Sequence, residues 1–128
     1  MGQSSVAVIR ISGPSSFSIA KKLTGTKKTR AHHEVALLLI KNNEGADLDR
    51  GLFTFFISPN SYTGEDIVEI SCHGNQLVVG IIISRCIQLG ARIAEPGEYT
   101  KRAFLNKKIS LSQAESVGVL ISSNLKRL

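Results

Sequence analysis

The stretch from Asp66 to His73 places ionisable side chains inside a run of apolar residues. Side chains alternate across a strand, so Ile67, Glu69, Ser71 and His73 would share one face. A carboxylate, a hydroxyl and an imidazole then stand in one row. A glutamate in the middle of a strand is unfavourable unless it is solvated or paired. The row is therefore either a candidate binding site or the solvent-facing side of an antiparallel sheet.

Arg10 is a second charged residue in an apolar setting, because it stands between Ile9 and Ile11. A guanidinium in such a run requires an acceptor, which can be a carboxylate, a phosphate or water. Three interpretations stay open from the residues alone. Arg10 could bind a ligand, lie on an exposed face, or form a structural ion pair, and Glu69 is one available partner.

Other chemistries are not indicated. The sequence has no Gly-x-x-x-x-Gly-Lys-Ser/Thr motif, so nucleotide binding of the Walker type is not expected. The three histidines have no metal-ligand spacing with cysteines or acids, so we predict no metal site. No residue order indicates nucleophilic catalysis, and we predict no catalytic residue. Cys72 and Cys86 fall on apolar faces, where we expect them to be buried as small hydrophobic side chains.

The chain has 128 residues, enough for one core, and a formal net charge of +6. That charge favours an anionic partner, although scattered solvated lysines are the alternative. No apolar run reaches the length of a membrane span, and the first five residues do not resemble a signal peptide. We therefore expect no membrane contact, and a location in the cytoplasm or an organelle matrix.

Periodicity predicts the elements that position these residues. The predicted strands are Val6–Ile11, His33–Ile40, Gly51–Ile57 and Asp66–His73. The predicted helices are Ser15–Leu23, Asn75–Leu89, Glu98–Leu105 and a last one that starts at a Ser-x-x-Glu capping box, Ser112–Glu115. Ala91–Ala94 is expected to be a short strand or extended. Alternating elements with one hairpin indicate an α+β (mixed α/β) fold, a mixed sheet packed on helices.

Four segments resemble motifs of one protein family, in the family's order and over nearly the whole chain. Val-Ile-Arg-Ile-Ser-Gly-Pro resembles its Ile-Ile-Arg-Ile-Ser-Gly-Pro, and Pro-Asn-Ser-Tyr-Thr-Gly-Glu-Asp resembles its Pro-Asn-Ser-Tyr/Phe-Thr-Gly-Glu-Asp. The segments are Val8–Pro14, Pro59–Asp66, Glu95–Asn106 and Lys108–Glu115. The chain thus resembles the amino-terminal, folate-binding domain of the MnmE/TrmE family of tRNA modification GTPases.

The resemblance implies a fold similar to the folate-binding domain of glycine-cleavage aminomethyltransferases. It implies a folate-binding and dimerisation domain over residues 1–109, and the start of a helical domain over residues 110–128. The expected assembly is a homodimer that binds 5-formyltetrahydrofolate, or a related tetrahydrofolate, at its interface. By motif position, Arg10, Glu69 and Lys108 match the family's folate-contacting residues. Glu69 could accept the adjacent N–H groups of a pterin ring, and the two cations could neutralise the folate tail.

The resemblance also implies a function in tRNA modification. With the flavoprotein MnmG, the family installs an aminomethyl group on the wobble uridine (U34) of tRNA. GTP, magnesium and potassium would bind a GTPase domain that these motifs do not include, so the chain is not expected to catalyse the reaction alone. Family members begin with a further strand, and here Met1–Ser5 stands in its place. The alternative is a basic tRNA- or protein-interaction module that does not bind folate.

Overall fold

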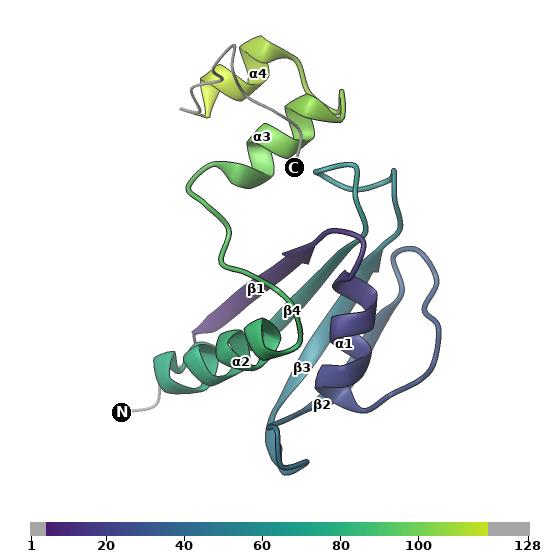
Figure 1. Ribbon diagram of the computed structural model, residues 1–128, viewed down its shortest axis with the longest axis vertical. Helices are drawn as coiled ribbons and strands as arrows, with labels where there is room; N and C mark the ends of the chain where they lie inside the picture. The colour runs from purple at the N-terminus through teal and green to yellow at the C-terminus, as the bar shows by residue number, and fades with distance from the viewer. Residues whose placement is uncertain (1–4, 118–128) are drawn as a thin grey trace.

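A four-stranded sheet forms the centre of the computed structural model, which describes residues 5–117 (Figure 1). The strands, in the order β1-β4-β3-β2, are β1 (Val6–Ser12), β4 (Ile67–His73), β3 (Asp47–Phe56) and β2 (Val35–Lys41). The helices are α1 (Ser16–Thr24), α2 (Gln76–Gln88), α3 (Glu98–Leu105) and α4 (Leu111–Ser116). Helices α1 and α2 cover one face of the sheet, and α3 and α4 lie beyond its end (Figure 1).

The core lies between the sheet and the helices α1 and α2. Alternate residues of the strands face the helices, as the sequence pattern predicts, and their burial removes apolar surface from water. The buried core residues include Ile11, Phe53, Val68, Ile70, Cys72, Leu23, Ile82 and Cys86. Both cysteines are free and buried, which confirms that prediction. Burial raises the pKa of the Cys86 thiol to about 11.

Specific residues satisfy the backbone groups at the ends of α1 and α2. Gly25 closes α1 in the left-handed conformation at φ 75°, and its amide donates to the carbonyl of Lys21. Asn75 caps α2, because its side chain accepts hydrogen bonds from the amides of Leu77 and Val78. None of the helices in the described part of the chain is long and apolar enough to cross a bilayer.

The α+β class is confirmed, with differences in detail. The described strand pairings are all antiparallel, so the sheet is not mixed as expected. Strand β3 begins at Asp47, before the predicted Gly51, because the residues directly after the turn also pair with β2. The last such pair is Asp47 with Lys41. Strand β2 begins at Val35, since residues 32–33 form a turn. Residues 91–94 form no strand.

The predicted start of the last helix is wrong. The capping box uses Ser110 and Gln113: the Ser110 hydroxyl accepts from the Gln113 amide, and the Gln113 side chain accepts from the Ser110 amide. Ser112 therefore lies inside α4. A Ser-x-x-Gln box satisfies the same two unpaired helix-start amides as a Ser-x-x-Glu box. The sequence contains one of each, and they start two residues apart, at Ser110 and at Ser112. The predicted continuation of this helix beyond Val117 lies outside the described residues.

The face of the sheet opposite α1 and α2, which we call the open face, carries exposed apolar side chains. The strand register aligns Leu37, Leu52, Ser71 and Val8 in one row across the four strands. The three apolar members of this row are exposed. The next row along the strands contains Thr54, Glu69 and Arg10. The open face thus places an apolar row directly beside a charged one.

Candidate functional site

Arg10 and Glu69 lie opposite each other on adjacent strands, β1 and β4. The Nε of Arg10 donates to Oε2 of Glu69 at 2.7 Å. Their side chains remain 54% and 30% exposed, so the pair is accessible on the open face. The pairing that the sequence left open is therefore present. Because the pair is exposed, it contributes little to stability, and its accessible charges remain available to a ligand.

A cavity of about 570 Å³ opens beside this ion pair. Arg10 and Glu69 form its polar part, and the remaining wall is apolar and aromatic. The residues of that wall are Val8, Phe56, Tyr62, Ile67, Ala94 and Tyr99. Such a site, mostly apolar with a few convergent polar groups, suits a small organic ligand. The carboxylate could accept from N–H donors at the edge of a ring, while the aromatic side chains contact its face.

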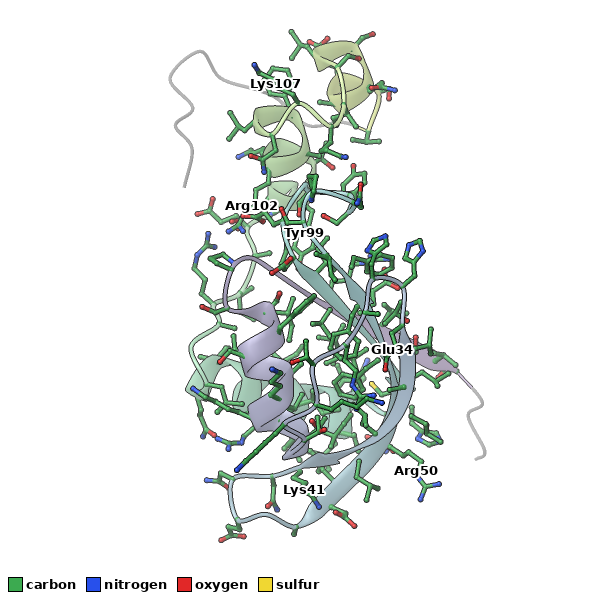
Figure 2. The ribbon with its side chains drawn as sticks, turned by 90° about the vertical axis from the view of Figure 1, so that its right-hand side faces the viewer. Glu34, Lys41, Arg50, Tyr99, Arg102 and Lys107 are labelled. Atoms are coloured by element: carbon green, nitrogen blue, oxygen red, sulfur yellow. The ribbon has the colours of Figure 1, made fainter. Side chains whose placement is uncertain are left out.

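Tyr99 and Arg102 lie where α3 meets the end of the sheet (Figure 2). The Tyr99 hydroxyl donates to the backbone carbonyl of Arg10 at 2.7 Å, which ties α3 to the strand that carries Arg10. Burial raises the pKa of Tyr99 above its usual value, so the hydroxyl stays protonated as a donor. The Tyr62 hydroxyl forms a hydrogen bond of 3.0 Å with the hydroxyl of Thr100 on the same helix.

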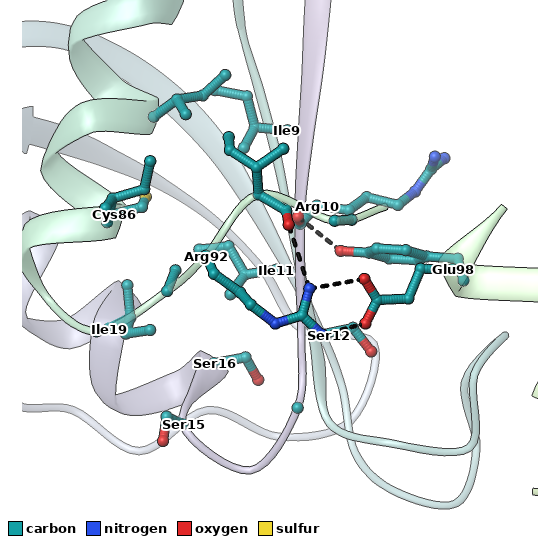
Figure 3. Close-up of a pocket in the computed structure, with 18 of the residues that line it drawn as sticks. Ile9, Arg10, Ile11, Ser12, Ser15, Ser16, Ile19, Cys86, Arg92 and Glu98 are labelled. Carbon is teal, nitrogen blue, oxygen red and sulfur yellow. Dashed lines mark hydrogen bonds and ion pairs between the residues drawn. The ribbon is translucent and has the colours of Figure 1, made fainter. Parts of the chain in front are cut away.

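A cluster of ion pairs around Glu98 holds α3 in this position. Glu98 is only 4% exposed, and Arg92 binds its carboxylate (Figure 3). Arg102 binds the same carboxylate. Hydrogen bonds from Arg92 and from the Glu95 amide, with the charge of Arg102, lower the pKa of Glu98 to about 2. Arg102 also binds Glu65 at 2.8 Å. The cluster therefore connects α3 to the β3–β4 loop and fixes the residue next to Glu98, Tyr99.

Lys108 does not line the cavity of Arg10 and Glu69. It borders a different hollow between α3 and α4, together with Phe104 and Gln113. Its aliphatic stem lies close to Gly64, where an added Cβ would be 3.3 Å from the Lys108 Cγ. Lys108 therefore sits against the β3–β4 loop that also carries Tyr62. The structure brings two of the three predicted site residues together and places the third at a different hollow.

The helix side of β1 has a larger cavity, of about 660 Å³ (Figure 3). Ile9, Ile19 and Cys86 contribute to its apolar lining, and Arg10 extends to the opposite side of the strand from Ile9 and Cys86 in Figure 3. Arg92 at its polar end is already bound to Glu98. We therefore place the candidate site in the smaller cavity, where the exposed Arg10–Glu69 pair is accessible.

Sequence reasoning did not single out the aromatic residues of the site. Tyr62 and Tyr99 fall inside two of the recognised motifs, so the motifs were the signal that could have found them. Phe56 had no such signal, because an aromatic residue at a strand end is ordinarily part of a core. His73, from the predicted polar row, instead bonds Asp49 at 2.8 Å. Within residues 5–117, no group of histidine, cysteine and acidic side chains is placed to hold a metal ion.

Comparison with known proteins identifies relatives of this chain. The family model described as the N-terminus of the GTP-binding protein TrmE matches residues 1–108. A protein named tRNA modification GTPase MnmE from Akkermansia muciniphila is 49% identical over 95% of this chain and 28% of its own length. Proteins of the same name from Chromobacterium violaceum and Neisseria meningitidis serogroup B are each 45% identical, over 96% of this chain and 27% of their length. The chain thus spans little more than a quarter of these relatives.

Proposed function

The chain belongs to the family described as the N-terminus of the GTP-binding protein TrmE, and on this premise we propose that it is the folate-binding and dimerisation domain of a tRNA modification GTPase. The cavity beside Arg10 and Glu69 is the observation that carries the proposal. It combines one accessible carboxylate, one guanidinium and an aromatic wall in a space of about 570 Å³. The reduced pterin of a tetrahydrofolate presents the complementary groups, a flat ring portion with adjacent N–H donors.

Glu69 is the residue best suited to recognise the ring edge. Arg10 holds its Oε2 atom, which fixes the orientation of the carboxylate. Among the described residues, the side-chain hydrogen bonds of Glu69 use this one oxygen, so Oε1 remains for a ligand donor. Charge-assisted hydrogen bonds of this kind are stronger than neutral ones. The residues present therefore fit the donor pattern of a pterin.

The tail of the folate would extend toward the helical end of the molecule. Lys108 is exposed, and its stem packs beside Gly64 in the loop that also contributes Tyr62 to the cavity wall. A negatively charged tail leaving the cavity past Tyr62 would approach this cation. Lys108 would thereby act at the tail, whereas Arg10, which the sequence assigned to the tail as well, would act with Glu69 at the ring.

The open face supports dimerisation. Leu37, Leu52 and Val8 are exposed in one row, and Val8 also lines the cavity. Contiguous exposed apolar surface commonly marks an interaction site. Two copies that pair through this face would cover the apolar row and bring the second copy next to the cavity. The folate would then lie at the dimer interface.

In the full-length relatives, the proposed role is part of a larger reaction. A bound 5-formyltetrahydrofolate would supply a one-carbon unit for modification of the wobble uridine of tRNA, with MnmG as the flavoprotein partner. Binding of GTP, magnesium and potassium would belong to the GTPase domain of those proteins. This chain would contribute binding, orientation and dimerisation.

Calorimetric titration with 5-formyltetrahydrofolate tests the proposal. We expect saturable binding by the unmodified chain and a loss of affinity of about tenfold or more for Glu69→Gln, because the ring donors lose a charged acceptor. Glu44→Gln is a matched control: it removes the same charge in the exposed turn between β2 and β3 and should bind as tightly as the wild type. Absence of heat at high micromolar ligand for the unmodified chain would refute folate binding.

A basic interaction module is the second candidate, and a cluster of lysines favours it. Lys21 and Lys22 lie in the last turn of α1, and Lys27 and Lys28 are exposed in the following loop. Binding of tRNA that weakens steeply with salt and is unaffected by folate would support this function. Substitution of Lys27 and Lys28 by glutamine should reduce the salt slope without changing folate affinity.

A further inference from the structure

The protein has two tyrosines and no tryptophan, and both tyrosines line the Arg10–Glu69 cavity. They come from separate elements: Tyr62 from the β3–β4 loop and Tyr99 from the first turn of α3. We propose that Tyr62 and Tyr99 are specificity-determining residues that select a flat heterocyclic ring by contact with its face. This inference rests on the proposed function and assigns the two side chains a role in it.

Tyr99 is held in position by its backbone and by its hydroxyl group. Its backbone follows Glu98, whose carboxylate is bound by Arg92 and Arg102. Its hydroxyl donates to the carbonyl of Arg10 at 2.7 Å. The ring therefore stands beside the Arg10 backbone before any ligand binds. An aromatic side chain held in this way loses little conformational entropy on binding.

Tyr62 is positioned by the loop around it. Its neighbour Thr63 is fully buried and bonds the hydroxyl of Ser12 at 2.8 Å. The side chain of Asn106 donates to the Thr63 carbonyl at 2.7 Å. The Tyr62 hydroxyl then meets that of Thr100, which follows Tyr99 in α3. The two tyrosines are thus linked through adjacent residues of one helix, although the loop and α3 are distant in sequence.

The aromatic side chains and the Glu69 carboxylate together define the chemical class of the ligand. Aromatic side chains favour a flat unsaturated ring, and Glu69 favours a ring edge with adjacent N–H donors. A sugar phosphate or an acidic peptide satisfies neither requirement. A 2-amino-4-oxo-pteridine satisfies both. The ring would be recognised by Tyr62, Tyr99 and Glu69 together, and the tail by contacts outside the cavity.

Leucine and phenylalanine substitutions separate ring contact from hydroxyl bonding. We expect Tyr62→Leu and Tyr99→Leu each to weaken binding of 5-formyltetrahydrofolate by about five- to a hundredfold, as loss of an aromatic stacking partner does elsewhere. Tyr62→Phe keeps the ring and should stay within about threefold of the wild type, since an exposed neutral hydrogen bond contributes little. The tail analogue p-aminobenzoylglutamate should bind the wild type and Tyr62→Leu equally.

Intrinsic fluorescence gives an independent readout, because all tyrosine emission comes from this cavity. Ligand should quench the wild-type emission, and it should quench the remaining tyrosine in each single variant. No binding by the unmodified chain would refute the proposed function itself. Tight binding by the wild type and by Tyr62→Leu alike, without quenching, would overturn the role of the tyrosines and leave folate binding intact. Tyr62 is half exposed, so its variant decides the question even if Tyr99→Leu does not fold.

Discussion

Glu98 is the buried carboxylate on which the position of α3 depends. It receives hydrogen bonds from Arg92, Arg102 and the Glu95 amide, the last at 2.8 Å. Breaking a buried ion pair costs more than the pair contributes, because the remaining charges lose their partner. Glu98 therefore affects the cavity without lining it: its loss would free the helix turn that carries Tyr99.

Glu98→Gln should lower the free energy of unfolding by about 1–3 kcal/mol at pH 7, since two arginines lose a charged acceptor. The folded pKa of about 2 lies below the usual value of 4.5. The stabilisation is therefore fully present above about pH 5 and is lost as the pH falls toward 2. Urea unfolding of wild type and variant at several pH values measures the difference. An unchanged difference between pH 6 and pH 3 would contradict this account.

At the scale of elements, the β3–β4 loop positions both Tyr62 and Lys108. Gly64 in this loop has φ 81°, a conformation that favours glycine. A Cβ at this position would lie 3.1 Å from the Asn106 Cβ and 3.3 Å from the Lys108 Cγ. A side chain at this position would therefore strain the backbone and require Asn106 and Lys108 to shift by a few tenths of an ångström.

Gly64→Ala should destabilise the protein by about 1–3 kcal/mol, from backbone strain and crowding together. Gly45→Ala is the matched control, because Gly45 has the same φ of 81° and open space around it. The difference between the two variants in thermal unfolding isolates the crowding. Equal losses for both would show that the contact with Asn106 and Lys108 is not tight.

The structure and the sequence pattern differ in the residue that caps α4: the structure has Ser110, and the pattern predicted Ser112. Ser110→Ala should remove the cap, at a cost of about 1 kcal/mol, and speed amide hydrogen exchange at Gln113. Ser112→Ala should leave that amide protected, because Ser112 lies within the helix. Loss of protection at the Glu115 amide in Ser112→Ala, with Gln113 unaffected in Ser110→Ala, would instead support the cap that the sequence pattern predicted.

Local signals predicted most elements, and long-range contacts account for what they missed. The predicted bounds of α3, Glu98–Leu105, agree with the structure. Alternation along β4 also predicted which side chains face the core, and the need of Arg10 for an acceptor made Glu69 one possible partner. The cavity was not predictable, since its wall joins Tyr62 and Tyr99 through contacts between distant segments. Lys108 was placed by resemblance alone, and its tail contact stays a prediction.

The whole molecule has two unlike faces. Two helices cover one side of the sheet, whereas the open face presents the row of Leu37, Leu52 and Val8 to solvent. Monomeric proteins rarely leave large contiguous apolar surface exposed. The cavity lies beside this row, so a second copy seated on the open face would also restrict access to the ligand.

Leu37→Lys should weaken dimerisation by at least about tenfold, because a charge would have to be buried in an apolar interface. Leu37 is 58% exposed, so the monomer should tolerate the change. Leu77→Lys is the matched control: Leu77 is 73% exposed on α2, on the opposite side of the sheet. Sedimentation equilibrium over a range of concentrations measures the dimerisation of both variants.

If dimerisation also completes the cavity, folate affinity should fall in Leu37→Lys and stay unchanged in Leu77→Lys. A wild type that remains monomeric at high micromolar concentration, with or without folate, would contradict the assembly.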